Sequence, residues 1–475
     1  MDALRALARR TRTSHPVVRL ATVAAAAGLA LTAGIVAAAG PWDGGQRAAE
    51  RDRAADATPG AGAAGFAEEE VAGAATAARV LAPLEAEGAA PAPAALRRAL
   101  GAPLADPALG PGGAAAAVVD VATGETVFSQ DARTGMAPAS TVKIVTAAAA
   151  LHTLGGGHRL TTTAVWDAGA GRVTLIGGGD PTLTDDDLAR LAERTADALA
   201  EEGVESVRVG YDDSLYPTQR HPIGVNENIA LITPLQVNAG RLDDSSHGPA
   251  PRAGDPAPAA AERFAAHLAD AGLRVRGGEP GHGAAPEDAV PLARHHSATV
   301  SVLVERMLTH SDNDLAEALS RHTALATGHR ADFRGAARAA TGVLEELGLP
   351  LAGVSLADGS GLDRDGRVTA ALLANLLTAA ASPDRPELRP ALTGLPVAGF
   401  TGTLSSRYSA DDGGAGLVRA KTGTLTGVNS LAGTAVTPGG RLLAFAFLAG
   451  DTTDPAGAEA ALDAAATALA TCACR

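Results

Sequence analysis

The chain has 475 residues, a formal net charge of −14 at pH 7 and a pI near 5.3. This acidity argues against nucleic-acid binding, for which proteins normally present a basic stripe. Alanine and glycine dominate and aromatic residues make up only 3% of the chain, which we attribute to the base composition of the coding sequence and not to function.

The first 40 residues carry the pattern of an export signal. An uncharged, mostly alanine run from Leu20 to Gly40 follows five arginines: Arg5, Arg9, Arg10, Arg12 and Arg19. Basic residues before an apolar stretch mark such signals, and alanines 37–39 offer a cleavage site. Because the run is also long enough to span a bilayer, residues 1–40 are predicted to be either a cleaved signal peptide or a signal anchor. Either way the rest of the chain is exported, and only this segment meets the membrane.

A stalk is predicted between this segment and the folded region. Residues 41–91 are rich in Ala, Gly and Pro, which indicates a flexible or partly helical linker. A short helix is expected at residues 94–100. The apolar residues 114–120 and the residues 126–129 flank a turn signal, which predicts a β-hairpin.

A helix is predicted from Thr141 to Leu151, directly after Ser140. Ser140 then lies at the N-terminus of this helix, and Lys143 lies three residues later on the same helical face. Residues 92–154 are therefore interpreted as the first part of a domain.

Residues 155–298 are predicted to form one smaller lobe inserted into that domain. They contain short strand-like runs, a helix-like stretch at 185–202, a strand and turn at 207–214, and a Pro- and Ala-rich patch at 249–260.

The second part of the domain is assigned to residues 299–475. Helices are predicted at 300–308 and from Asp314, and the last third reads as three strands and an Ala-rich helix, at 416–422, 428–436, 441–448 and 456–470. Helices before and after an antiparallel meander predict an α+β fold, in which helices cover the sheet.

Lysine occurs at only two positions of the chain, Lys143 and Lys421, and all other side chains of the Lys/Arg type are arginine. Arginine stays protonated in proteins, whereas a buried lysine can become neutral and act as a base. These two positions are therefore predicted to need chemistry that arginine does not supply.

Both lysines belong to short motifs, and three such motifs occur in order: Ser140-x-x-Lys143, Ser311-Asp312-Asn313 and Lys421-Thr422-Gly423. Each motif alone is weak, since Ser-Asp-Asn before a helix is an ordinary capping turn. With only two lysines in the chain, however, chance placement of both in this ordered set is very improbable. The trio is typical of class A β-lactamases and penicillin-binding proteins.

The chemistry of these residue types fits an activated serine. Ser140 needs a base to remove its proton, and Lys143 can serve when neutral, a state that the positive charge of Lys421 would favour. The helix N-terminus at Ser140 would stabilise a developing oxyanion. Ser311 can relay a proton and Asn313 can hold a substrate amide. A substrate carboxylate can be bound by the strand residues Lys421, Thr422 and Thr424.

At these motifs the chain resembles the class C low-molecular-mass penicillin-binding proteins, the D-alanyl-D-alanine carboxypeptidase/endopeptidase family S13. The resemblance covers about residues 92–471. Further family signatures follow in their expected order: residues 177–182, 212–214, 358–362 and 402–404. The resemblance implies a serine β-lactamase/DD-peptidase-like fold. The insert looks shorter than in members with two inserted subdomains, so one lobe is expected.

The resemblance also implies roles for the motif residues. Ser140 would be the acylated nucleophile and Lys143 the general base, with Ser311 in proton relay and Asn313 in relay and substrate binding. The substrate carboxylate would be bound by Lys421, Thr422, Gly423 and Thr424. Backbone N–H groups of Ser140 and Thr424 would form the oxyanion hole.

The expected function is therefore that of an exported serine DD-peptidase. Its substrates would be peptidoglycan stem peptides ending in D-Ala-D-Ala, and β-lactam antibiotics would inhibit it. Two alternatives stay open: a β-lactamase on the same scaffold, and a non-catalytic penicillin-binding sensor or scaffold.

No metal or cofactor is expected. The 12 histidines include no H-E-x-x-H motif, and His295 and His296 are adjacent instead of one helical turn apart. The glycines at 177–179 lack the G-K-[ST] of a phosphate-binding loop. Cys472 and Cys474 are too few and too close for a disulfide framework.

Overall fold

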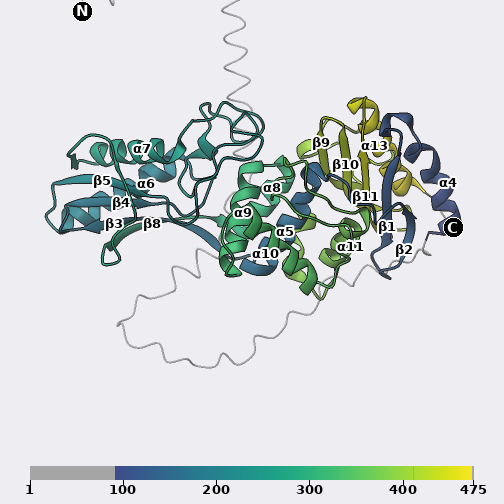
Figure 1. Cartoon of the computed structure of the whole chain (residues 1–475), viewed down its shortest axis with the longest axis horizontal. Coiled ribbons are helices and arrows are strands. Elements are labelled where there is room, and N and C mark those ends of the chain that lie inside the picture. The colour runs from purple at the N-terminus through teal and green to yellow at the C-terminus, as the bar shows by residue number, and fades with distance from the viewer. Residues whose placement is uncertain (1–90, 410, 473–475) are drawn as a thin grey trace, which may run out of the picture. The chain divides into compact units, whose positions relative to one another are not determined.

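The computed structural model describes residues 91–409 and 411–472 (Figure 1). The predicted signal segment 1–40 and nearly all of the predicted stalk 41–91 lie outside these residues. Within the described ranges, no helix is both long enough and apolar enough to cross a membrane.

An antiparallel five-stranded sheet forms the centre of the domain that carries the motifs. Its strands run in the order β2-β1-β11-β10-β9. Their bounds are Thr126–Gln130 (β2), Ala114–Asp120 (β1), Leu442–Gly450 (β11), Val428–Val436 (β10) and Val418–Leu425 (β9). The predicted hairpin and meander are thus confirmed, and the meander extends the hairpin into one sheet because β1 pairs with β11.

Helices cover both faces of this sheet (Figure 1). The helices α4 (Pro93–Leu104) and α13 (Pro455–Thr471) pack on the face that carries the large residues of β11, Leu443, Phe445 and Phe447. The other face carries Ala444, Ala446 and Leu448 of the same strand, in a core shared with the short helix α12 (Pro390–Thr393) and five longer helices. These are α5 (Lys143–Leu154), α8 (Val300–His310), α9 (Asn313–Ala326), α10 (Phe333–Glu346) and α11 (Ala370–Ala381).

The alternation of side chains along β11 therefore separates two cores, as the period of two in a strand requires. Alanine on the face toward α11 leaves room for that helix to approach the sheet closely. The predicted α+β architecture, a sheet covered by helices, is confirmed.

A second sheet of mixed direction has a core of its own. Its strands are β6 (Arg274–Val275), β5 (Ser206–Asp212), β4 (Arg172–Ile176), β3 (Arg159–Asp167) and β8 (Val290–Thr299), in that order, with β7 (Gly281–His282) paired to β5. The helices α6 (Asp185–Glu201) and α7 (Pro256–Asp270) share its core. Apart from Thr299, the last residue of β8, these elements fall within the predicted inserted lobe, whose limits at 155 and 298 stay a prediction.

Helix α7 was not expected, because its first residues read as a Pro- and Ala-rich patch. Pro256 and Pro258 both lie in the first turn of α7. The N–H groups of a first turn have no partner within the helix, so proline costs little there. The prolines mark the beginning of this helix and do not interrupt it.

Candidate active site

Ser140 lies in the 3₁₀ turn η3 (Ala139–Val142), one turn before α5 begins at Lys143. The predicted helix start at Thr141 is therefore two residues too early, because residues 139–142 form a 3₁₀ turn that leads into α5. Ala139 has a φ of +47°, a left-handed conformation that costs a non-glycine residue about 1–2 kcal/mol. The surrounding structure must hold this turn in place.

Two glycines make that close packing possible. A Cβ on Gly361 would lie 1.9 Å from the carbonyl oxygen of Ala139, and a Cβ on Gly423 would lie 2.8 Å from that of Pro138. The Pro138 carbonyl also accepts a hydrogen bond from Ser430 Oγ at 2.8 Å. The turn of Ser140 is thus held between the 358–363 segment and strand β9.

Lys143 is completely buried, and its Nζ contacts three oxygens. It lies 3.0 Å from Ser140 Oγ, 2.6 Å from Asn313 Oδ1 and 2.6 Å from the Ser360 carbonyl. The orientation of the Asn313 amide is set by its Nδ2, which donates to the Asn228 carbonyl at 2.9 Å. Two of the three partners can only accept, so a neutral amine gives both of its hydrogens to them. Its lone pair is then left facing the hydroxyl of Ser140.

Burial lowers the pKa of Lys143 to about 8, although nearby carboxylates, Asp358 foremost, oppose the effect. We had expected the charge of Lys421 to be the cause. Instead, the pKa of Lys143 is lowered mainly by the loss of hydration on burial. The charge of Lys143 in turn helps to lower the pKa of Lys421. Because of this burial, a minor fraction of Lys143 is neutral at pH 7 and most of it is neutral above pH 8.

The Ser311-Asp312-Asn313 motif forms the junction between α8 and α9. Ser311 ends α8 in the left-handed region with a φ of +57°, and Asp312 caps α9 by accepting a hydrogen bond from the N–H of Leu315 at 3.0 Å. The motif is thus a capping turn as well. It brings Asn313 to Lys143 and leaves the Ser311 hydroxyl without a hydrogen-bond partner among the described residues.

A cavity of about 260 Å³ opens in front of Ser140. Four of the predicted site residues line it: Ser140, Ser311, Asn313 and Thr424. Its other wall includes residues that precede β8 in the chain: Asn228, Arg241, Gly248, Pro249 and Arg252. The structure therefore brings Ser140 of the first motif, the whole second motif and Thr424, which directly follows the third motif, to one cavity.

Lys421 is not at the surface of this cavity. It is fully buried, and its Nζ donates a hydrogen bond to the carbonyl of Thr422 at 2.8 Å. Burial, then the charges of Lys143 and Arg407, lower the pKa of Lys421 well below its usual value. The Thr422 hydroxyl donates to Thr403 at 2.9 Å. The predicted direct contact between the Lys421 amine and a substrate carboxylate is untested. The burial of this amine does not support it.

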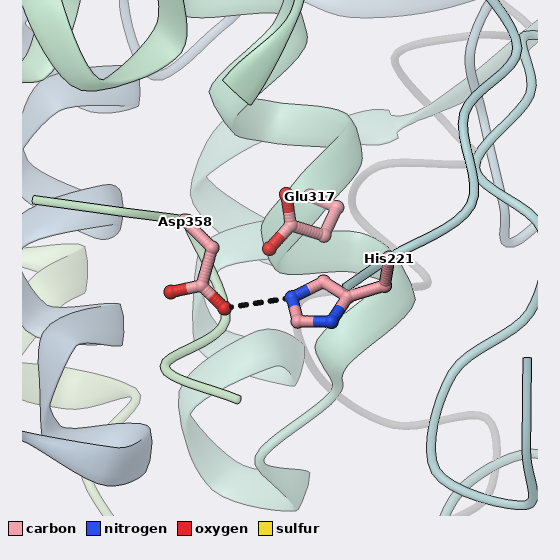
Figure 2. Close-up of side chains that lie close together, drawn as sticks. All are labelled: His221, Glu317 and Asp358. Carbon is pink, nitrogen blue, oxygen red and sulfur yellow. Dashed lines mark hydrogen bonds and ion pairs between the residues drawn. The ribbon is translucent and has the colours of Figure 1, made fainter. Parts of the chain in front are cut away.

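A buried polar cluster next to Lys143 was missed by the sequence analysis. It joins Glu317 and Arg321 of α9, Asp358 of the signature 358–362, and His221. Figure 2 shows Glu317, Asp358 and His221. Only the Asp358 signature carried a signal in the sequence. His221 lies 137 residues from Asp358 in the chain, so no local pattern could have paired them.

The amino-acid sequence of the chain matches known peptidases over most of its length. Residues 96–244 and 240–470 match the model of the D-Ala-D-Ala carboxypeptidase 3 (S13) family. This chain belongs to the S13 family. Carboxypeptidase DacB of Mycolicibacterium smegmatis is 36% identical over 490 aligned residues, which cover 98% of both chains. The D-alanyl-D-alanine carboxypeptidase of an Actinomadura species is 30% identical over 434 residues, covering 73% of this S13 chain and 79% of that one.

A solved structure shares the fold of this S13 chain. Penicillin binding protein 4 of Haemophilus influenzae superposes with a TM-score of 0.63 at 22% identity, and the match covers 78% of this chain and 98% of that one. That protein is also known in complex with a β-lactam. The predicted DD-peptidase-like fold, the family and the enzyme class, a D-Ala-D-Ala carboxypeptidase, are therefore confirmed.

Replacing Gly423 by alanine is expected to lower the activity of this S13 enzyme about 100-fold, since the new Cβ would push strand β9 away from the Ser140 turn and small misplacements of reacting groups are costly. The Cβ would lie 2.1 Å from Ser430 Oγ as well as 2.8 Å from the Pro138 carbonyl. The measurement is kcat/KM for D-Ala release. Gly342→Ala is the matched control, because nothing lies within 4 Å of a Cβ there. Equal activities of the two variants would contradict the proposed packing.

Proposed function

We propose that this chain is an exported serine DD-peptidase that releases the terminal D-Ala of peptidoglycan stem peptides through an acyl-enzyme on Ser140. The observation that carries this proposal is the arrangement around Lys143. Lys143 Nζ lies 3.0 Å from Ser140 Oγ, and because its two other partners are acceptors, the neutral amine would direct its lone pair at the Ser140 hydroxyl. A nucleophile beside a buried base of this kind is what acyl transfer at an amide requires.

In the proposed acylation, Lys143 takes the proton of Ser140 as Oγ bonds to the carbonyl carbon of the penultimate D-Ala. The C–N bond to the terminal D-Ala then breaks, and its nitrogen takes up a proton. Ser311, whose hydroxyl lies at the same cavity, relays that proton. Water then attacks the ester, which frees Ser140 and the shortened peptide.

The remaining motif residues are proposed to hold the substrate. Asn313 is fixed between Lys143 and the Asn228 carbonyl, where it can orient the peptide. Thr424 lines the cavity with Ser140, and their backbone N–H groups would bind the developing oxyanion. The substrate carboxylate would lie near Thr422, Gly423 and Thr424, and Lys421 would support this strand through its hydrogen bond to the Thr422 carbonyl.

β-Lactams are proposed to acylate Ser140 as well, because their strained amide and carboxylate imitate the D-Ala-D-Ala terminus. The β-lactam complex of Haemophilus penicillin binding protein 4 supports this step by analogy of fold. A long-lived adduct is expected from a peptidase. Fast turnover of penicillin would favour the β-lactamase alternative.

Export is proposed from the N-terminal pattern of arginines followed by an uncharged run. The enzyme would then act at the outer face of the cell membrane or in the cell wall, where its peptidoglycan substrate lies. Cell fractionation with an epitope at the C-terminus tests this, since recovery in the cytoplasm would contradict it.

The test of the function is D-Ala release from a soluble disaccharide-pentapeptide by the purified chain, with Ser140→Ala as control. Release that disappears in this variant supports a serine DD-carboxypeptidase. Absence of release by folded wild-type protein, or equal release by Ser140→Ala, would overturn the proposal. The lifetime of the penicillin adduct then separates a β-lactamase from a non-catalytic binder.

The rate should depend on pH through Lys143. Only the neutral amine accepts a proton, so kcat/KM should fall as the pH decreases through the pKa of Lys143, which is about 8. We expect a midpoint near pH 8 and a tenfold loss for each pH unit below it. Thermal unfolding at each pH separates this effect from loss of folded protein. A kcat/KM that stays constant between pH 6 and 9 would exclude Lys143 as the titrating base.

A further inference from the structure

His221, Glu317 and Asp358 form a compact cluster whose polar atoms lie within 4.8 Å of one another. In Figure 2 the imidazole of His221 points at the Asp358 carboxylate, with Glu317 beside them on its helix. All three residues are buried. Glu317 belongs to α9, Asp358 precedes the turn 359–363, and His221 comes from the chain between β5 and β8.

The hydrogen bonds of His221 define its tautomer. Its Nδ1 accepts a hydrogen bond from the backbone N–H of Ile223 at 3.3 Å, a group that can only donate. Its Nε2 lies 3.0 Å from Asp358 Oδ2. Although burial alone would raise it, the hydrogen bonds from His221 and Ser360 hold the pKa of Asp358 below its usual value. Asp358 is therefore a carboxylate, and His221 is the neutral tautomer that donates from Nε2.

This bonding makes the cluster a structural network and not a metal site. Both ring nitrogens of His221 are engaged, so no lone pair of the ring is left for a cation. Glu317 Oε2 accepts from Arg321 at 2.9 Å, and Glu317 Oε1 accepts from the N–H groups of Gly359 and Ser360 at 3.0 and 2.9 Å. The carboxylate oxygens are thus already used by protein donors.

The network leads from His221 to the base. Asp358 accepts hydrogen bonds from Ser360 Oγ at 2.7 Å and from three backbone N–H groups, those of Gly361, Leu362 and Asp363. These bonds hold the turn so that the Ser360 carbonyl meets Lys143 Nζ at 2.6 Å. That carbonyl takes one of the two hydrogens of the neutral amine and so helps to direct the lone pair at Ser140.

We propose that His221 is a positioning residue for the acylation step. Through His221, the segment between β5 and β8 holds Asp358 and the turn 359–363, and the Ser360 carbonyl of that turn orients Lys143. The inference rests on the proposed role of Lys143 as base. The segment between β5 and β8 would then have two roles. It lines the substrate cavity, and its His221 side chain supports the catalytic base through Asp358 and Ser360.

The charged groups around His221 belong to the same network. Arg321, which pairs with Glu317, also donates to Gln219 Oε1 at 3.2 Å and lies over the ring of Phe333 at 4.2 Å. The ring of His221 meets that of Phe333 edge-on, with centroids 5.4 Å apart. Phe333 thus contacts the imidazole without contributing to the hydrogen bonds of Asp358, which makes it a suitable control position.

The test compares four variants in the full chain, with the acylation rate by a chromogenic β-lactam, kcat and KM for D-Ala release, and the thermal midpoint as readouts. His221→Leu removes the donor, and His221→Asn keeps an amide too short to reach Asp358. His221→Gln places an amide N–H near the position of Nε2. Phe333→Leu weakens packing against the ring and leaves the bond to Asp358.

We expect His221→Leu and His221→Asn to lower kcat and the acylation rate about 10- to 100-fold with little change in KM. His221→Gln should retain most of the wild-type rate. Phe333→Leu should be acylated as fast as the wild type. If His221→Leu is not folded, the comparison of His221→Asn with His221→Gln decides. Wild-type rates in the Asn and Leu variants, or equal losses in all four, would overturn the inference. Failure of the proposed function is seen separately, as wild-type protein that releases no D-Ala.

Discussion

Replacing Lys143 by arginine is expected to lower the acylation rate about 10²- to 10⁴-fold, the range that general bases contribute, although the positive charge is kept. Arginine stays protonated, so it cannot take the proton of Ser140. It is also larger, while Lys143 is 0% exposed and its Nζ lies 2.6 Å from two oxygens. The measurement is the rate of D-Ala release together with the rate of penicillin adduct formation.

Two controls make this result specific. Ser140→Ala sets the background for both reactions, and the thermal midpoint of Lys143→Arg shows whether the variant is folded. Near-wild-type turnover by folded Lys143→Arg would mean that the rarity of lysine in this chain does not reflect a need for a base.

The parts of the site that were predicted from sequence are those with a local signal. Ser140 and Lys143 are three residues apart, so the geometry of a helical turn was enough to place them together. The capping turn at Ser311 and the strand at Lys421 also carry short-range patterns. The scarcity of lysine joined these separate signals, because it made two of the motifs improbable by chance.

The parts that were missed depend on tertiary contacts. Lys421 was expected to bind a substrate carboxylate directly, but the fold buries it completely, and its pKa falls as a result. An alanine carries no sequence signal for the left-handed φ of Ala139, and the turn is held by tertiary contacts with Gly361 and Gly423. The pairing of His221 with Asp358 depends on how a distant segment folds back onto α9.

Glu317→Leu is expected to destabilise the protein by about 3–5 kcal/mol, the usual cost of leaving one member of a buried ion pair alone. The side chains of Glu317 and Arg321 are both 0% exposed and lie 2.9 Å apart. The substitution also removes the acceptor of the N–H groups of Gly359 and Ser360, so the turn that supports Lys143 should loosen. Urea unfolding measures the loss of stability, and D-Ala release by the fraction that stays folded measures the loss of catalysis.

A double variant distinguishes the ion pair from simple packing. Leucine at both Glu317 and Arg321 leaves no uncompensated charge, and replacing a whole buried pair by apolar residues is often nearly neutral. We therefore expect the double variant to be more stable than Glu317→Leu alone, although the contacts of Arg321 with Gln219 and Phe333 are lost. The single variant Arg321→Leu completes the comparison. A loss of stability in the double variant equal to the sum of the losses in Glu317→Leu and Arg321→Leu would show that the pair is not energetically coupled. The turn 359–363, whose Ser360 carbonyl contacts Lys143, would then be held chiefly by Asp358 and its partner His221.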